Sequence, residues 1–201
     1  YFLEQGKKDG MVNVVKAISR SNDIFFYKLA EKISVDTLSQ MASQFGVGKK
    51  MEIDLPSESR GLLPTKSWKT RVIKEPWYLG DTYHYGIGQG YLLTTPLQVN
   101  SWTATIANGG FVYKPHLLKS EGTGEGTKIL SENTVALIRQ GMIDSCKPGG
   151  VAWPLYEFRI QNSEFRIDGK NYLAVKNATG AAVRNDLREV SIACKTGTAQ
   201  H

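Results

Sequence analysis

The sequence predicts a mixed α/β or α+β domain, because helical patterns precede strand patterns along the chain. The chain has 201 residues, which suits about one domain and is enough to bury a hydrophobic core. Hydrophobic residues make up 41% and charged residues 22%, as in ordinary globular domains and unlike disordered or coiled-coil chains. No internal repeat is present.

Two helices are predicted near the start of the sequence. A helical run opens around Val12–Ile18, and a second helix follows Ser21. Either Ser21 or Asn22 is expected to be its N-cap, with Asp23 in the first turn, where the helix dipole favours a carboxylate. The apolar positions of this second helix follow the spacing i, i+3, i+4, i+7 and are Phe26, Leu29, Ala30 and Ile33.

A third helix is expected between Asp36, as its cap, and Gly46, which closes it. The segment from residue 49 to 85 is predicted to be a loop, because it contains three prolines and no sustained hydrophobic period. A glycine-rich turn, Gly86-Ile87-Gly88-Gln89-Gly90, comes next.

Two further helices have clear start signals. Thr95 and Pro96 read as N-cap and first residue of a helix that runs to about Ala107, where an Asn-Gly-Gly sequence ends it. Ser131 is expected to cap another helix that runs to about Ile143.

Strand patterns follow. Residues 165–167 and 172–175 flank Asp168-Gly169, a strong signal for a β-hairpin. The segment 189–198 is predicted to be a strand, because Val190, Ile192 and Cys194 alternate with polar positions.

The formal net charge of +6 is spread along the chain. Its one local basic run is interleaved with Trp68 and Trp77 and comprises Lys66, Lys69, Arg71 and Lys74. We expect a solvated loop whose lysine stems lie against apolar surface, the alternative being a site for an anionic partner. No nucleic-acid-binding motif is present, so we expect no nucleic-acid partner.

The cysteines and histidines indicate neither a metal site nor a cofactor. There is no Cys-x-x-Cys pair, and the three histidines are far apart in the sequence. Cys146 and Cys194 could form one disulfide, but their spacing cannot decide whether they do.

Three motifs carry the functional signal. Lys195-Thr196-Gly197-Thr198 offers a cation, two hydroxyls and a glycine without side-chain bulk, which suits the docking of a peptide that bears a carboxylate. Ser21-Asn22-Asp23 is either a simple helix cap or a proton relay built on Ser21, with Asp23 as its polar partner. The glycine turn 86–90 lacks the Lys-Ser/Thr of a phosphate-binding loop.

The order of these motifs resembles the transpeptidase domain of class B penicillin-binding proteins. The stretches 21–27, 68–82 and 115–118 are similar to the elongation-type members, the penicillin-binding protein 2 group. The resemblance runs from about residue 5 to the end and is weakest over 155–189, which we interpret as an insertion that holds the hairpin. The whole chain, 1–201, is therefore interpreted as a partial transpeptidase domain. The resemblance implies the penicillin-binding-protein/β-lactamase-like fold, a helical subdomain plus an antiparallel sheet, incomplete in this chain.

The resemblance also implies an activity, D,D-transpeptidation of peptidoglycan stem peptides through an acyl-serine intermediate. Ser21 would relay protons between the catalytic lysine of the family, which this chain lacks, and the leaving amine. Asp23 would order that missing lysine and the substrate amide, and Lys195 would be a further catalytic residue. The substrate carboxylate would be bound by Lys195, Thr196 and Thr198, with Gly197 leaving room for it. The turn residues Gly86, Gly88, Gln89 and Gly90 would pack behind the site. No serine of the chain is followed three residues later by lysine, so the Ser-x-x-Lys nucleophile is expected upstream and this chain alone should be inactive.

Partners and location are further implications of the resemblance. They are stem peptides, β-lactam antibiotics, and a membrane glycosyltransferase with other proteins of the cell-elongation machinery. The parent protein would be anchored in the cytoplasmic membrane, with this domain on the outer face. Two alternatives stay open, a D,D-carboxypeptidase or β-lactamase-like hydrolase and a non-catalytic β-lactam sensor. An unrelated basic binding module would require all three motifs to be coincidences.

Overall fold

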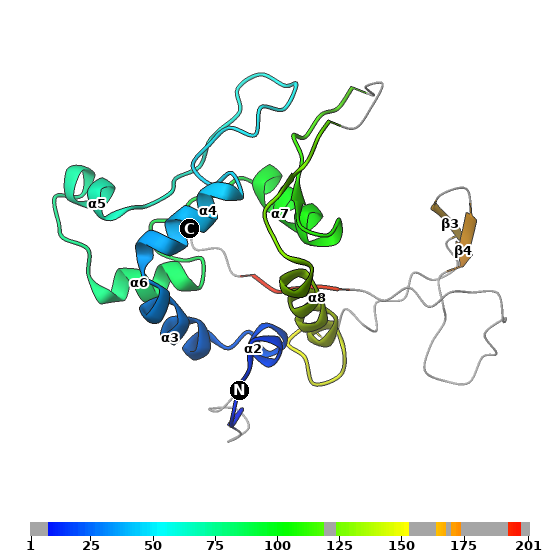
Figure 1. The fold of residues 1–201 in the computed structure, drawn as a ribbon, viewed down its shortest axis with the longest axis horizontal. Helices are drawn as coiled ribbons and strands as arrows, with labels where there is room; N and C mark the ends of the chain where they lie inside the picture. Colours follow the sequence, from blue (N-terminus) through cyan, green and yellow to red (C-terminus); the bar gives the residue numbers. More distant parts are fainter. Residues whose placement is uncertain (1–7, 119–123, 153–163, 168–169, 174–192, 198–201) are drawn as a thin grey trace.

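The structure, a computed structural model, describes residues 8–118, 124–152, 164–167, 170–173 and 193–197 (Figure 1). Its helices are α2 (Val14–Arg20), α3 (Asp23–Ile33), α4 (Val35–Gln44), α5 (Lys66–Val72), α6 (Leu79–Gly86), α7 (Pro96–Ala107) and α8 (Glu132–Cys146). Its strands are β1 (Phe111–Val112), β2 (Thr127–Lys128), β3 (Glu164–Ile167) and β4 (Lys170–Leu173). The strands form two antiparallel pairs, β1 with β2 and β3 with β4.

The first two described helices meet at a sharp turn. Asn13 caps α2 by accepting a hydrogen bond from the Lys16 amide at 2.9 Å. Ser21 ends α2 in the left-handed conformation, with φ 51° and ψ 52°. Asn22 then caps α3, because its side-chain oxygen accepts from the Phe25 amide at 2.9 Å. Of the two expected caps for this helix, the structure therefore selects Asn22 and leaves the Ser21 hydroxyl for other contacts.

The expectation that Asp36 caps the next helix is wrong. Helix α4 begins two residues earlier than predicted, at Val35, and its N-cap is Ser34, which also ends α3. Because the amide of Ser34 still bonds to the Ala30 carbonyl at 3.0 Å, the two helices share one residue and leave no linker in which Asp36 could act as a cap. Asp36 lies in the first turn, where its carboxylate pairs with Lys66 at 2.6 Å.

The predicted loop 49–85 is also wrong in part, since it contains α5 and α6. Each has only 7 or 8 residues, too few to show a hydrophobic period in the sequence. Local polar contacts mark their starts instead. The Thr65 hydroxyl accepts from the Trp68 amide at 3.1 Å, and the Asp81 carboxylate accepts from the Tyr78 amide at 2.7 Å.

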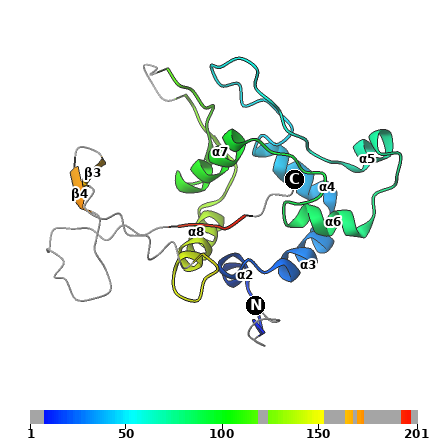
Figure 2. The same ribbon diagram turned by 180° about the vertical axis from the view of Figure 1, so that it is seen from behind.

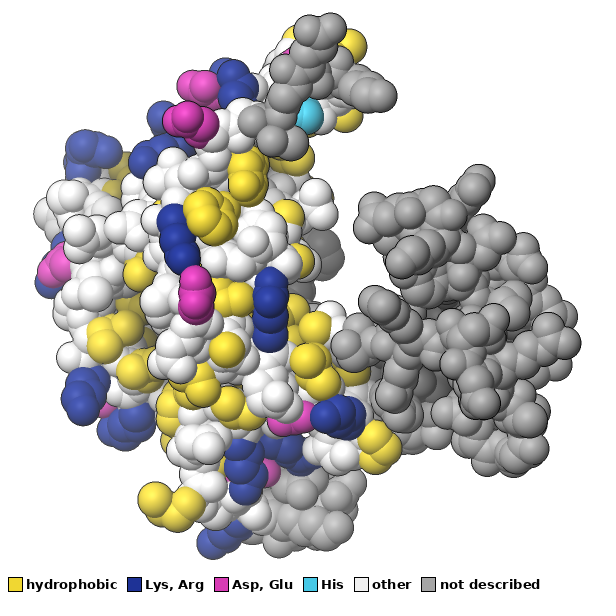
Figure 3. All heavy atoms as spheres, turned by 45° about the vertical axis from the view of Figure 1, so that its right-hand side comes forward, with side chains coloured by type: hydrophobic (Ala, Val, Ile, Leu, Met, Phe, Trp, Pro, Cys, Tyr) yellow, Lys and Arg dark blue, Asp and Glu magenta, His cyan; other side chains and the backbone are white. Residues whose placement is uncertain are grey.

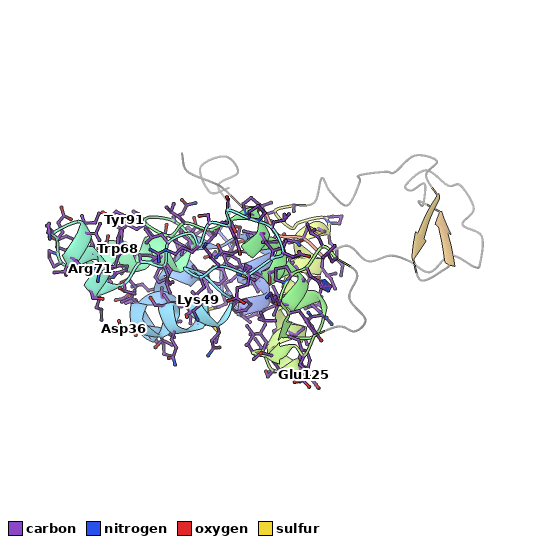
Figure 4. All side chains as sticks on the ribbon, turned by 90° about the horizontal axis from the view of Figure 1, so that it is seen from above. Asp36, Lys49, Trp68, Arg71, Tyr91 and Glu125 are labelled. Atoms are coloured by element: carbon purple, nitrogen blue, oxygen red, sulfur yellow. A yellow bond between two sulfur atoms is a disulfide. The ribbon has the colours of Figure 1, made fainter. Side chains whose placement is uncertain are left out.

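Lys69 belongs to the basic run but does not lie in a solvated loop. Its side chain is only 2% exposed, and its ammonium lies 2.6 Å from the Asp81 carboxylate and 4.6 Å from the centre of the Tyr78 ring. Burial opposes the charged form, but the hydrogen bond and charge of Asp81 outweigh it, so the pKa of Lys69 is raised. The neighbouring Trp68 packs against Tyr91 at 5.3 Å between ring centres, at one end of the molecule (Figure 4). The ion pair thus joins α5 to α6.

The glycine turn begins where α6 packs against α3. A Cβ atom on Gly86 would lie 2.6 Å from the Ala30 Cβ and 3.2 Å from the Phe26 carbonyl oxygen, so only glycine fits there. Gly88 and Gly90 follow with φ of 77° and 76°, in the left-handed region that favours glycine. Gly86, at the start of the turn, therefore allows the close approach of α6 to α3.

Helix α7 begins and ends where its sequence signals predict. Its third residue, Gln98, makes several buried hydrogen bonds. Gln98 is fully buried, and its side-chain oxygen accepts from the Thr95 amide at 2.9 Å. Its amide nitrogen donates to the carbonyl oxygens of Gly46, Lys49 and Arg60 at 2.9, 3.0 and 3.2 Å. One side chain thereby completes a capping box and holds the loop that follows α4.

Ser131 caps α8 as predicted, and this helix packs closely on α2. At the crossing, a Cβ atom on Gly141 would lie 2.7 Å from the Ile18 Cβ and 3.1 Å from the Val15 carbonyl oxygen. The absence of a side chain on Gly141 is what allows the two helices to approach each other this closely. Both views of the ribbon show α2 and α8 side by side (Figures 1 and 2).

The two strand predictions have different outcomes. The hairpin is confirmed, with Glu164 opposite Leu173 and Ile167 opposite Lys170, while Asp168, Gly169 and the end of the second predicted strand lie outside the described residues. The strand predicted over 189–198 is wrong for its described part, 193–197, which has no regular secondary structure. A strand needs a paired neighbour, whereas the Cys194 amide donates its hydrogen bond to the Met142 carbonyl of α8, at 3.1 Å.

The described surface has no concentrated basic patch on the face seen in Figure 3, where lysines and arginines are scattered among acidic and apolar side chains. Among the described helices, none is long and apolar enough to cross a membrane.

The crossing of α2 and α8 gives a stability prediction. We expect Gly141→Ala to lower the free energy of unfolding by roughly 1–3 kcal/mol, because the new methyl group collides with the Ile18 Cβ and with backbone. The matched control is Gly80→Ala in α6, where a Cβ atom meets nothing within 4 Å. Alanine there should be neutral or stabilising by up to about 1 kcal/mol. Urea unfolding of the two variants would measure the difference, and equal stabilities would contradict the close approach.

Candidate active site

The site centres on a contact between two residues that are 174 positions apart in the sequence. The ammonium of Lys195 donates a hydrogen bond to the Ser21 hydroxyl oxygen at 2.8 Å. It also donates to the carbonyl oxygen of Thr196 at 2.9 Å. Because Ser21 accepts from the ammonium, its own O–H proton is free to be directed elsewhere, so the pair can pass a proton and attract an anion.

Ser21 is held by the turn between α2 and α3. The residue before Ser21 is Arg20, whose guanidinium lies 3.4 Å from the Asp9 carboxylate. The residue after it is Asn22, whose side-chain amide donates to the same carboxylate at 3.1 Å. Both flanking residues of Ser21 are thus tied to one carboxylate. The sequence carries no signal for this role of Asp9, which is twelve residues away from Ser21 and belongs to no motif.

Lys195 is held by α8. The amide of Cys194 donates to the Met142 carbonyl at 3.1 Å, and Cys194 forms a disulfide with Cys146, at the end of α8, with the two Cα atoms 5.9 Å apart. Figure 2 shows this segment, in red, running beside α8. The pairing that the cysteine spacing left open is therefore present in the structure.

The loop after α8 fastens the same helix to the end of α2. The Val151 amide donates to the Ser19 carbonyl at 3.0 Å, and the Arg20 guanidinium donates to the Gly149 carbonyl. A side chain on Gly150 would collide with the Ser145 carbonyl oxygen, so this loop folds tightly against the last turn of α8. This loop therefore links α8, to which Lys195 is attached, to the end of α2, where Ser21 lies.

The surroundings of Lys195 act on its pKa in two opposite directions. Partial desolvation lowers the pKa of the Lys195 ammonium below its ordinary value, and the negative charge of Asp23 offsets some of that shift. Asp23 is the first residue of α3 and is exposed. Asp23 therefore acts on Lys195 through its charge.

The structure brings together Ser21, Asp23 and Lys195 of the predicted site residues, with Thr196 and Gly197 exposed beside them. Thr198 lies outside the described residues. The glycine turn contributes Gly86 to the packing of α6 on α3, the helix that begins at Asp23. Among the residues that the structure describes, no group of three or more His, Cys, Asp or Glu could hold a metal ion.

Comparison with known proteins gives the family of this site. The family model for the penicillin-binding protein transpeptidase domain matches residues 3–201. The chain belongs to this family. The transpeptidase family is also the one that the order of the three motifs indicates.

Individual relatives agree with the family. A protein named peptidoglycan D,D-transpeptidase MrdA from Salmonella typhimurium is 48% identical over 116 residues, which are 58% of this chain and 19% of that protein. The MrdA of Acinetobacter baumannii is 39% identical over 191 residues, 95% of this chain and 25% of that protein. The chain thus spans about a fifth to a quarter of the length of these relatives.

A solved structure confirms the predicted fold class. The penicillin-binding protein PBP2 of Helicobacter pylori, solved as a complex with MreC, matches with a TM-score of 0.62 and 35% identity. The match covers 68% of this chain and 26% of that one. The transpeptidase domain boundaries and the proposed insertion over 155–189 stay predictions.

The charge of Asp23 gives a pH prediction for the complete protein. Asp23→Asn removes the charge that raises the pKa of Lys195, so that pKa should fall further and the ammonium should be lost at lower pH. We expect the alkaline limb of the pH profile for acylation by penicillin to move to lower pH.

Two controls separate this effect from others. Asp23→Glu keeps the negative charge, so the alkaline limb of its pH profile should stay closer to the pH found for the unchanged protein. In a Lys195→Arg background the guanidinium stays protonated, so Asp23→Asn should no longer move the limb. An alkaline limb that stays at the same pH in Asp23→Asn would contradict the coupling.

Proposed function

We propose that the protein carrying this chain is a peptidoglycan D,D-transpeptidase of the elongation type. The observation that carries the proposal is the 2.8 Å contact between Lys195 and Ser21, because it joins two of the family's motif positions in one place. Membership of the transpeptidase family supplies the reaction class. A serine attacks the penultimate D-Ala carbonyl of a stem peptide, terminal D-Ala leaves, and an amine of a second stem peptide resolves the acyl-enzyme.

The described residues would divide the work by charge and hydrogen bonding. Lys195 would bind the terminal carboxylate of the stem peptide through a charge-assisted contact, with Thr196 beside it. Ser21 would pass a proton to the leaving amine, because its hydroxyl can accept from the Lys195 ammonium while it donates to a substrate nitrogen. Asp23 would keep Lys195 charged.

Part of the machinery is proposed to lie outside the described residues. The nucleophilic serine and the lysine that activates it are expected in a Ser-x-x-Lys sequence, which these 201 residues do not contain. Thr198 is proposed to contribute its hydroxyl to carboxylate binding and its backbone amide to the oxyanion hole. Gly197 would allow the substrate to lie close to the backbone.

Partners and location follow as proposals from the relatives. β-Lactams would acylate the same serine as the stem peptide. The complex of the Helicobacter pylori protein with MreC supports an assembly with cell-elongation proteins, and a membrane glycosyltransferase is a further proposed partner. The site is proposed to lie on the outer face of the cytoplasmic membrane, where the peptidoglycan substrate is.

Product analysis tests this proposal. The complete protein is incubated with a fluorescent penicillin and, separately, with a disaccharide-pentapeptide substrate. A transpeptidase should give a covalent label and cross-linked dimers, whereas a D,D-carboxypeptidase should give free D-Ala without dimers. A label with neither product would favour the β-lactam sensor, and no label at all would contradict the transpeptidase assignment.

A further inference from the structure

We propose that the Cys146–Cys194 disulfide is a positioning element of the active site, which holds Lys195 beside Ser21 and makes acylation depend on the redox state of this pair. The inference rests on the proposed function, because it assigns to the disulfide a role in placing a proposed binding residue. It goes beyond that function in making the site sensitive to thiol reagents.

The first argument is the place of the crosslink. Cys194 directly precedes Lys195, and its partner is the last residue of α8 and only 1% exposed. The Cα atoms are 5.9 Å apart, within the usual range for a disulfide. A covalent bond from a packed helix therefore ends one residue away from the ammonium that contacts Ser21.

The second argument is that few other contacts fasten this segment among the residues that the structure describes. The described residues 193–197 form no strand, and the Cys194 amide donates a backbone hydrogen bond to the Met142 carbonyl of α8. In the part of the chain that the structure describes, residues 193 and 195–197 are exposed. The disulfide is the covalent link that ties this segment to α8, one residue before Lys195.

The third argument is the rigidity of the helix that carries the crosslink. Helix α8 is fastened to α2 by the close approach at Gly141 and by the bond from Val151 to Ser19. Because Ser21 ends α2, the same packing fixes the other partner of the contact. The disulfide thus fixes the position of Lys195 relative to Ser21, because it attaches Lys195 to α8 and α8 packs closely on α2.

The chemistry is ordinary thiol–disulfide exchange. A dithiol reductant attacks one sulfur to form a mixed disulfide, and its second thiol then releases the protein. The reductant is oxidised to a cyclic disulfide, and Cys146 and Cys194 each gain one proton as free thiols. An oxidising compartment, such as the outer face of the cytoplasmic membrane, would keep the pair joined.

The test compares acylation in the oxidised and reduced complete protein. We expect dithiothreitol to lower the second-order rate constant for acylation by benzylpenicillin about ten-fold, since a misplacement of about 1 Å can cost on the order of 100-fold. Cys146→Ser and Cys194→Ala should show the lower rate from the outset and should not respond to dithiothreitol. Alkylation and mass spectrometry of the non-reduced, denatured protein should find no free thiol at either cysteine.

A second readout separates positioning from simple destabilisation. The methyl ester of benzylpenicillin lacks the carboxylate that Lys195 would bind. Loss of positioning should therefore slow the free acid more than the ester and bring their rate ratio towards one. General unfolding would slow both equally, so an unchanged ratio would overturn the proposal, even if both rates fell.

The outcomes distinguish this inference from the proposed function. If the oxidised protein acylates normally and dithiothreitol changes neither the rate nor the ratio, the positioning role is wrong and the transpeptidase proposal stands. Two free thiols in the non-reduced protein would also overturn it. If the oxidised protein is not acylated at all, the proposed function itself fails.

Discussion

The close packing of α2 on α8 at Gly141 is the constraint on which the site depends. Ser21 ends α2, and the segment that carries Lys195 is attached to α8 through Cys194. The distance between the two functional side chains is therefore set by the distance between the two helices. A residue larger than glycine at this crossing would separate them, because its Cβ would lie 2.7 Å from that of Ile18.

The two sides of the site are fixed in different ways. The Ser21 side is built from backbone geometry, with the left-handed Ser21 between two helices and the Asp9 carboxylate bound to both of its neighbours. The Lys195 side is an irregular segment attached to α8 at Cys194. The Ser21 hydroxyl is thus placed by backbone geometry, whereas the position of the Lys195 ammonium depends on the attachment of its segment to α8.

Features that depend on neighbouring residues in the sequence could be predicted, whereas features that depend on contacts between distant residues could not. The α7 and α8 starts were predictable, because Thr95-Pro96 and Ser131 are local cap signals. Helix α5 also starts at a local cap, Thr65, but its 7 residues are too few to show a hydrophobic period. The buried ion pair of Lys69 with Asp81 of α6, which stabilises it, is a contact that no hydrophobic period reveals. Residues 193–197 alternate like a strand, but strand formation also needs a neighbour, which the sequence pattern does not specify. For the site, motif order indicated Ser21, Asp23 and Lys195, whereas Asp9 and the cysteine pairing depend on long-range contacts.

The Ser21 hydroxyl is proposed to take part in the chemistry, apart from the backbone role of Ser21 in ending α2. Ser21→Gly tests this role most directly in the complete protein. Glycine removes the hydroxyl and suits the left-handed backbone at this position, so the thermal midpoint should change little. Acylation by penicillin should fall by roughly 10²–10⁴-fold, as for other general acid–base groups. The matched control is Asn22→Ala, which removes the N-cap of α3 and should cost about 1 kcal/mol of stability with a far smaller effect on acylation. Full acylation in Ser21→Gly would contradict the account.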